Sequence, residues 1–258
     1  MAISDVTPSI KPPLSAPGTM SPRTAPNGKA IKNQVLLSIP DEEFMVVRPH
    51  LEATDMPRYR VLFEQGEKVE HVYFPNEGMI SLVVVTHDGK SVEVGITGRS
   101  GVAGVPLAFG FDYAPTRAIV QLPGAGLRIS SAAARENFEK TPYLRAVIER
   151  YVLVQQFQVA QIAACNRLHD IEQRLARWLL MCQDSVDSEV LPLTHEFLSQ
   201  MLGSGRPSVT IAAGILERAG LIANSRGAIR IANRKQLEGA ACECYAVIQK
   251  FSASAGLI

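Results

Sequence analysis

The spacing of apolar and polar positions changes twice along the chain. Residues 1–33 contain many prolines and no apolar periodicity, so we expect a flexible tail without a packed core. From 34 to 130 the apolar positions form short runs, rich in β-branched and aromatic residues and separated by glycines. Closely spaced short strands of this kind predict a β-barrel or jelly roll, with a hairpin turn at Asp88-Gly89.

The third texture begins near residue 131, where the apolar positions take helical spacing. Between Pro142 and Asn166 the chain has neither glycine nor further proline, and its apolar positions cover a wide surface. Such a helix can pack on its own barrel or share a seam with a second copy of the chain. We favour the seam, because the apolar surface is wider than one contact needs. The predicted dimer interface comprises Leu144, Val147, Tyr151, Val154 and Ile162.

A helix-turn-helix pattern lies within residues 169–245. Thr194 is placed to cap a short helix, and Gly203 is placed to end it. Pro207 then suits the first turn of a second helix. Two short helices across a glycine turn form the helix-turn-helix motif. The segment 221–231 predicts a small hairpin after it, which would be a wing.

Positive charge is concentrated on this motif. The whole chain has a formal net charge of +1, so any affinity for nucleic acid has to come from a local patch. Between Gly203 and Lys235 only one acidic residue, Glu217, accompanies six basic residues. Such a patch can neutralise phosphates while the second helix reads base edges in the major groove. A charged subdomain that binds protein is the alternative, and the wing and the patch both count against it.

Composition excludes several other classes. The four cysteines include no C-x-x-C pair, so we expect reduced thiols and no metal site. For Cys242 and Cys244 we favour unrelated thiols on a helix, with a redox or metal role as the alternative. No apolar stretch of about 18 residues is free of charges, and the N-terminus lacks the apolar region of a signal peptide. We therefore expect a cytoplasmic protein.

The order of barrel, long helix and winged helix resembles the cyclic-AMP receptor protein and FNR superfamily (CRP/FNR) of bacterial transcription regulators. The match spans about 37–244, and residues 170–180 and 193–222 carry it most specifically. The resemblance implies an α+β fold with an N-terminal β-barrel or jelly roll of the cyclic-nucleotide-binding type, a long dimerisation helix and a C-terminal winged helix-turn-helix. The expected domains are a flexible tail (1–33), a sensor-like barrel (34–130), the long helix (131–168), the DNA-binding domain (169–245) and a C-terminal tail (246–258).

The resemblance also assigns DNA-reading positions. The residues that face bases in the family correspond to Arg206, Pro207 and Ile211. Arg206 can donate two hydrogen bonds to guanine and is the one strong base reader. Pro207 and Ile211 stand where family members often carry Glu and Arg, so the recognised sequence should differ from the best-known site. The predicted DNA-binding set is Thr194, Ser204, Arg206, Pro207, Ser208, Thr210, Ile211 and Arg226.

The segments that hold a cyclic nucleotide in the family are altered. A G-E-L turn and a later R-S-A supply a glutamate for the ribose and an arginine for the phosphate. Here Val105 replaces the glutamate, and Arg117 lies one place late, which on a strand means the opposite face. We expect an effector other than cyclic AMP, or none, although the turn at 100–104 could still cradle an anion. The candidate effector pocket comprises Ser100, Gly101, Gly104, Val105, Thr116 and Arg117.

No cofactor is predicted. The iron–sulfur cluster of the FNR branch needs cysteines ahead of the barrel, and the first here is Cys165. A metal-dependent barrel enzyme is a further alternative, but His71 and His87 form no H-x-H or H-x-D pair. The expected protein is therefore a homodimeric, non-enzymatic regulator that binds double-stranded DNA, with RNA polymerase as a candidate further partner. Its barrel would serve as a sensor for an unknown small molecule or as a ligand-independent scaffold.

Overall fold

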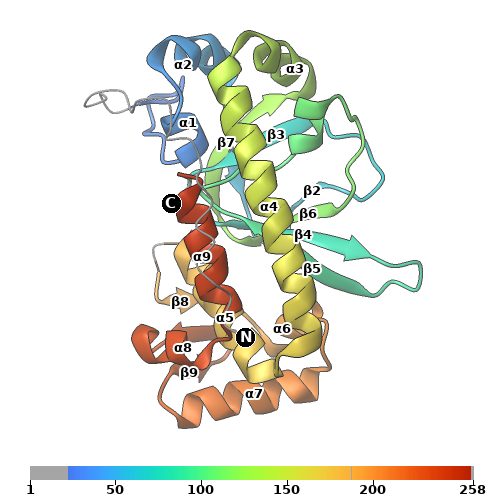
Figure 1. Cartoon of the computed structure of the whole chain (residues 1–258), viewed down its shortest axis with the longest axis vertical. Helices are drawn as coiled ribbons and strands as arrows, with labels where there is room; N and C mark the ends of the chain where they lie inside the picture. Colours follow the sequence, from blue (N-terminus) through green and yellow to red (C-terminus); the bar gives the residue numbers. More distant parts are fainter. Residues whose placement is uncertain (1–22, 187, 257–258) are drawn as a thin grey trace, which may run out of the picture.

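The computed structural model describes residues 23–186 and 188–256. Figure 1 shows a β-sheet domain at one end, a long helix α4 (Pro142–Leu168) running down the molecule, and a small domain of helices and strands at the other end. This mixed architecture confirms the predicted fold class and order of parts. None of the helices within the described ranges combines the length and hydropathy needed to cross a membrane.

Two antiparallel sheets form the barrel domain. One has the strand order β1-β7-β3 and the other β2-β6-β4-β5. Their inward side chains, such as Phe74, Leu127 and Val120, are buried in one core. The predicted turn at Asp88-Gly89 joins β4 to β5, and Gly89 adopts a positive φ of 79° there. The strands are β1 (Glu52–Met56), β2 (Val61–Phe63), β3 (His71–Pro75), β4 (Met79–Val85), β5 (Ser91–Thr97), β6 (Arg117–Leu122) and β7 (Gly124–Ser130).

Residues 23–33 pack against the barrel domain, so the predicted flexible tail is wrong for this part; residues 1–22 lie outside the described residues. Arg23 is buried and donates to the carbonyl of Ile39 at 2.6 Å. Ala25 and Ile31 join the barrel core. The segment is irregular, so it shows no apolar periodicity although it is packed. It leads into α1 (Gln34–Leu37), α2 (Asp41–Val47) and the 3-10 helix η1 (Arg48–His50).

The five residues predicted to form the dimer interface are buried within the chain itself. Leu144, Val147, Tyr151 and Val154 belong to the barrel core, and the Tyr151 hydroxyl lies 2.8 Å from Thr97 Oγ1 on β5. The prediction of a seam is wrong at these four positions, because the barrel domain covers them, and Ile162 is buried within the chain as well. Two other elements of this domain contact α4, namely η2 (Val105–Phe109) and α3 (Ser131–Lys140).

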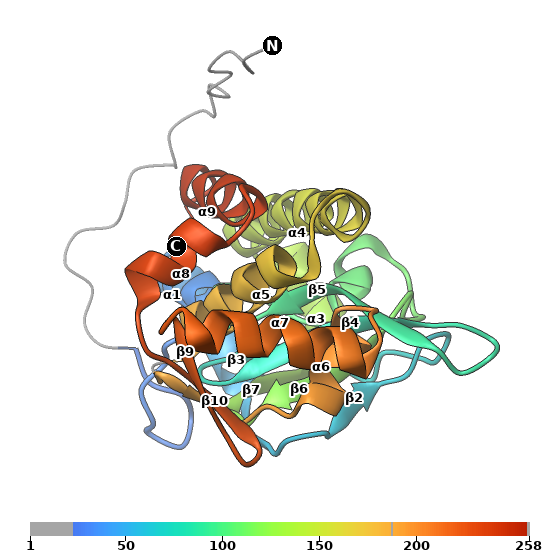
Figure 2. The same ribbon diagram turned by 90° about the horizontal axis from the view of Figure 1, so that it is seen from below.

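The C-terminal residues also form a packed helix. α9 (Cys244–Ser254) lies alongside α4 in Figures 1 and 2, and the rings of Phe157 and Phe251 stack at 4.4 Å. Ala255, one residue beyond α9, is buried in the barrel core. The predicted C-terminal tail is therefore wrong for residues 246–256.

The second domain has its own core. Trp178, Leu198 and Val209 are buried there, and the core continues onto the barrel through Met79 and Leu122. The two domains thus share a contact on the four-stranded sheet. The elements of this domain are α5 (Ile171–Ser185), β8 (Val190–Leu191), α6 (His195–Met201), α7 (Arg206–Arg218), β9 (Ile222–Ser225), β10 (Ala228–Ile231) and α8 (Arg234–Ala240).

Candidate nucleic-acid interface

Helices α6 and α7 and the hairpin β9–β10 form one end of the molecule. The Thr194 hydroxyl accepts a hydrogen bond from the Phe197 amide at 3.2 Å and so caps α6. Gly203 adopts a positive φ of 55° in the turn, a backbone conformation that favours glycine. Pro207 lies in the first turn of α7, where a missing N–H costs nothing. In Figure 2 α7 crosses this end of the molecule, with the hairpin β9–β10 beside one end of the helix.

The outer face of α7 carries the predicted base-reading residues. Val209 and Ala212 turn inward and are fully buried, whereas the Arg206 side chain is 66% exposed and Ile211 is 62% exposed. Glu196 lies 3.6 Å from the Arg206 guanidinium, and both side chains are exposed, so the pair is weak and Arg206 can exchange it for another acceptor. Pro207, Ser208 and Thr210 are exposed as well.

A hydrogen-bond network joins α6, α7 and the wing. His195 Nδ1 lies 3.2 Å from Thr210 Oγ1, and its Nε2 lies 3.4 Å from Asn224 Oδ1. The Asn224 backbone amide and side chain donate to the Glu217 carboxylate at 2.8 and 2.9 Å, and these bonds lower the pKa of Glu217. The one acidic residue of the basic segment therefore orients the wing. Sequence reasoning missed this network, since its members lie 7 to 29 residues apart with no local pattern.

An open cleft of about 410 Å³ lies between the two helices and the wing. It brings together three predicted residues, Thr194, Arg206 and Arg226, and its remaining walls come from Leu193, His195 and wing residues. The cleft is polar and carries two arginines, which suits a phosphate backbone rather than an apolar ligand.

The predicted basic patch is smaller than the sequence suggests. Arg218, Arg226 and Arg230 are exposed. Arg234, in contrast, pairs with Asp184 at 2.6 Å and donates to Tyr245 Oη at 2.7 Å, so it fastens α8 to α5 and α9. The predicted contact residue Ser204 is half-buried, 3.4 Å from the Arg174 guanidinium.

The structure does not gather the six predicted effector residues into one pocket. Gly104, Val105 and Thr116 line a cavity of about 50 Å³, room for little more than a water molecule or two. Arg117 is not among its lining residues; it pairs with Glu64 at 2.6 Å, while its neighbour Ala118 is buried.

The other two predicted effector residues, Ser100 and Gly101, border the Tyr151 ring. A Cβ at Gly101 would lie 2.5 Å from that ring, so the aromatic side chain already fills the space beside the turn. A nucleotide-sized ligand needs a cavity of roughly 300 Å³ or more. The cavities beside Gly104 and Tyr151, about 50 Å³ each, are therefore too small for a nucleotide. Ser100 also borders an open cleft of about 390 Å³, but the other walls of that cleft come from Gln34, Arg99, α5 and α9 and not from the predicted effector residues.

A buried carboxyl group joins the two domains. Glu93 on β5 is buried and accepts a hydrogen bond from Trp178 Nε1 of α5 at 2.7 Å. Ser81 Oγ on β4 donates to the other carboxyl oxygen. Burial raises the pKa of Glu93 to about 7, and the two hydrogen bonds only partly oppose this. No sequence pattern predicted this contact, because a lone Glu in a strand is typical of an exposed position.

The interpretation of Cys242 and Cys244 as unrelated thiols on a helix is wrong. Cys242 lies between α8 and α9, and only Cys244 is helical. Both side chains are buried beside Cys165, and His169 lies next to them. The sequence could not show this convergence, because 77 residues separate Cys165 from Cys242.

Two family models match the chain in the observed order of its domains. The cyclic nucleotide-binding domain matches residues 55–140, and the Crp-like helix-turn-helix domain matches residues 173–240. The Global nitrogen regulator of Nostoc sp. is 26% identical over 179 residues, which cover 64% of this chain and 78% of that protein.

Solved structures show the same fold. FixK2 from Bradyrhizobium japonicum aligns with a TM-score of 0.64 at 13% identity, covering 74% of this chain and 98% of that chain. The c-di-GMP-responsive global regulator CLP from Xanthomonas campestris aligns with a TM-score of 0.62 at 15% identity, covering 74% and 99%. With its barrel, its helix-turn-helix and both family models in the expected order, the chain belongs to the CRP/FNR superfamily of transcription regulators.

Proposed function

We propose that the protein is a sequence-specific transcription regulator that inserts α7 into the major groove of duplex DNA. The exposed N-terminal end of α7, with Arg206 beside the wing, is the observation that carries this proposal. Residues at this end of a recognition helix reach base edges, and the wing arginines reach the flanking phosphates. Arg206 would read a guanine, while Ser208, Thr210 and Arg226 would fix the register.

The protein would act as a homodimer. Although one face of α4 is covered by the barrel domain, the opposite face exposes Leu153, Ala160, Ala163 and Ala164 at helical spacing. Leu153 is 60% exposed, and its apolar side chain would be covered by a second copy. Two copies paired along α4 would place their recognition helices about one turn of DNA apart and select an inverted repeat.

A genomic binding-site selection tests this function. The recovered motif should be an inverted repeat, and Arg206→Ala should lose the preference at one base pair in each half-site by about 1 to 3 kcal/mol. Arg128→Ala, which removes an arginine from the barrel domain, is the matched control and should leave the motif unchanged. Recovery of no motif from the unmodified protein would refute the proposal.

A ligand-independent barrel is the second candidate, and the small cavity beside Gly104 favours it. The barrel would then act as a scaffold or as a surface for a partner, with RNA polymerase as the candidate. A thermal-shift screen against cyclic nucleotides and metabolites discriminates the two. A ligand at 100 times its dissociation constant should stabilise the folded protein by about 2.7 kcal/mol, whereas a scaffold should show no shift.

A further inference from the structure

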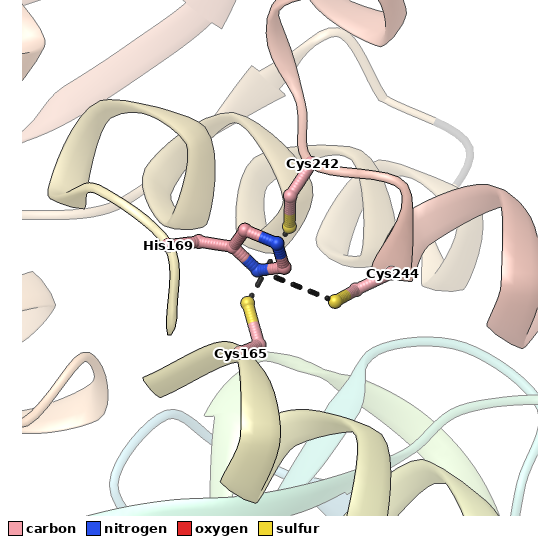
Figure 3. A group of neighbouring side chains, drawn as sticks. All are labelled: Cys165, His169, Cys242 and Cys244. Carbon is pink, nitrogen blue, oxygen red and sulfur yellow. Dashed lines mark hydrogen bonds between the residues drawn. The ribbon is translucent and has the colours of Figure 1, made fainter. Parts of the chain in front are cut away.

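Three cysteines and one histidine converge where the long helix meets the DNA-binding domain (Figure 3). Cys165 lies in the last turn of α4, and His169 follows four residues later as the residue that ends the helix. Only Asp170 separates His169 from α5. Cys242 and Cys244 come from the other end of the DNA-binding domain, where α8 is joined to α9.

The four ligand atoms have the spacing of a single-ion site. Cys165 Sγ lies 3.4 Å from Cys242 Sγ, and Cys244 Sγ lies 3.5 Å from His169 Nδ1. All four atoms are within 4.8 Å of one another. Around a tetrahedral zinc ion, Zn–S bonds of about 2.3 Å place neighbouring sulfurs about 3.8 Å apart. The cluster is therefore close to the size of one tetrahedral zinc site and too compact for a multi-iron cluster.

The histidine is held in the orientation of a metal ligand. Its Nδ1 faces the sulfurs, and its Nε2 lies 3.2 Å from a carboxylate oxygen of Glu243. Metal-binding histidines commonly donate their second ring N–H to a carboxylate, which fixes the tautomer and raises the basicity of the liganding nitrogen. Gln161 Nε2 donates to Cys244 Sγ at 3.1 Å, as expected beside a thiolate. Ligand and supporting residues are thus both in place.

Buried positive charge accompanies the thiols. Three thiolates and a neutral imidazole around Zn²⁺ carry a net charge of −1. Arg174 and Arg177 of α5 are both buried, and each interacts electrostatically with Cys165. Arg177 also interacts electrostatically with the Glu93 carboxyl, and the Arg174 guanidinium donates to the Leu202 carbonyl. An anionic metal centre would offset the cost of burying these two charges.

We propose that Cys165, His169, Cys242 and Cys244 bind one zinc ion, with His169 as an Nδ1 ligand. Binding releases the three thiol protons to solvent and involves no change of oxidation state. The ion ties the end of α4 to the α8–α9 connection, so it fixes the DNA-binding domain at both of its ends. The site is structural rather than catalytic, because four protein ligands leave no open position for water.

Metal analysis of the reduced full-length protein tests the site. We expect one zinc ion per chain, and X-ray absorption should show three sulfurs at about 2.3 Å and one nitrogen at about 2.0 Å. Cobalt in place of zinc should give the intense visible bands of a tetrahedral, thiolate-rich site. These measurements use the unmodified protein, so they do not depend on how a variant folds, and they are independent of DNA binding.

Variants then identify the ligands. Cys165→Ser and Cys242→Ser should abolish stoichiometric zinc, whereas Cys182→Ala, which removes a buried cysteine of α5 outside the cluster, should retain it. Glu243→Gln should weaken zinc affinity by about 10- to 100-fold, as loss of a supporting residue does. Failure of the reduced protein to bind zinc or cobalt would overturn the proposal. So would stoichiometric iron with sulfide, or zinc retained by both serine variants.

Discussion

The DNA-facing end and the barrel interior belong to the two domains that define the family, but the first is open to solvent and the second is filled. At the DNA-facing end, Arg206 and Ile211 project into solvent beside a cleft of about 410 Å³. Inside the barrel, three of the six positions expected to hold an effector line a cavity of about 50 Å³, and Tyr151 fills the space beside Gly101.

This difference separates the surface that binds DNA from the pocket that would sense an effector. A surface that binds DNA has to stay exposed, because the DNA approaches it from solvent. An effector pocket remains useful only while its ligand is used, and large side chains can fill it at a gain in apolar burial. Signals would then reach the DNA-binding domain through other contacts, such as Glu93 with Trp178 or the cysteine cluster.

The largest expected effect concerns the contact between the two regions. Folding raises the pKa of Glu93 to about 7 from 4.5, so the folded protein binds this proton more tightly than the unfolded chain does. The resulting stability is fully present below pH 4.5 and is lost as pH rises through about 7, by about 3 kcal/mol in total. Denaturant unfolding at pH 5 and pH 8 measures it.

Glu93→Gln should remove most of that pH dependence, since an amide does not ionise. Glu149→Gln, on the exposed face of α4, is the matched control and should leave it intact. An unchanged difference between pH 5 and pH 8 in Glu93→Gln would show that this carboxyl is not the group responsible.

The filled state of the barrel can be tested by adding one methyl group. Gly101→Ala would place its Cβ 2.5 Å from the buried Tyr151 ring, so we expect a loss of about 1 to 3 kcal/mol in unfolding free energy. Gly239→Ala, in α8 with no neighbour within 4 Å, should be neutral or slightly stabilising. Equal stability of Gly101→Ala and the parent protein would mean that the ring can move aside and the space is not truly filled.

The extent of the DNA surface can be sharpened with two arginines of different surroundings. Arg226→Ala should weaken binding similarly on all sequences and reduce the slope of log affinity against log salt by about 1. Arg234→Ala should instead lower stability and leave that slope unchanged, because Arg234 pairs with Asp184. Fluorescence anisotropy over a salt series measures both slopes. If both variants showed the same reduction in slope, Arg234 would also have to contact DNA.

The smallest effect is expected at the displaced arginine of the barrel. Arg117 and Glu64 are each about one third exposed, so Arg117→Ala should cost less than about 1 kcal/mol. Cyclic AMP should not change the melting temperature of either protein. Stabilisation by cyclic AMP that disappears in Arg117→Ala would break the comparison, since it would show that the barrel still holds a nucleotide.

The sequence predicted the elements better than their partners. The capping residue Thr194 and the turn glycine Gly203 are local signals, so both helices of the motif lie where the pattern placed them. The apolar positions of α4 were correctly identified as a buried surface, but Tyr151 packs on the chain's own barrel rather than on a second copy. An apolar stripe has the same pattern whichever surface covers it.

The remaining surprises come from long-range contacts. Arg234 belongs to the basic segment and so was expected to contact DNA, but it donates a hydrogen bond to Asp184, which lies 50 residues earlier. The two cysteines near the C-terminus form a cluster only together with Cys165 and His169, which lie more than 70 residues away. No local rule could bring such residues together, because the folding of the intervening domain places them.

The helix α9 has a mechanical consequence. Because α9 returns along α4 and stacks Phe251 on Phe157, the DNA-binding domain is attached to the rest of the chain at its beginning and at its end. A domain held by one linker can swing in any direction, but one held at two points can turn only about the line that joins them. Any other reorientation of α7 would have to slide α9 along α4, so α9 would restrain the movement of the domain.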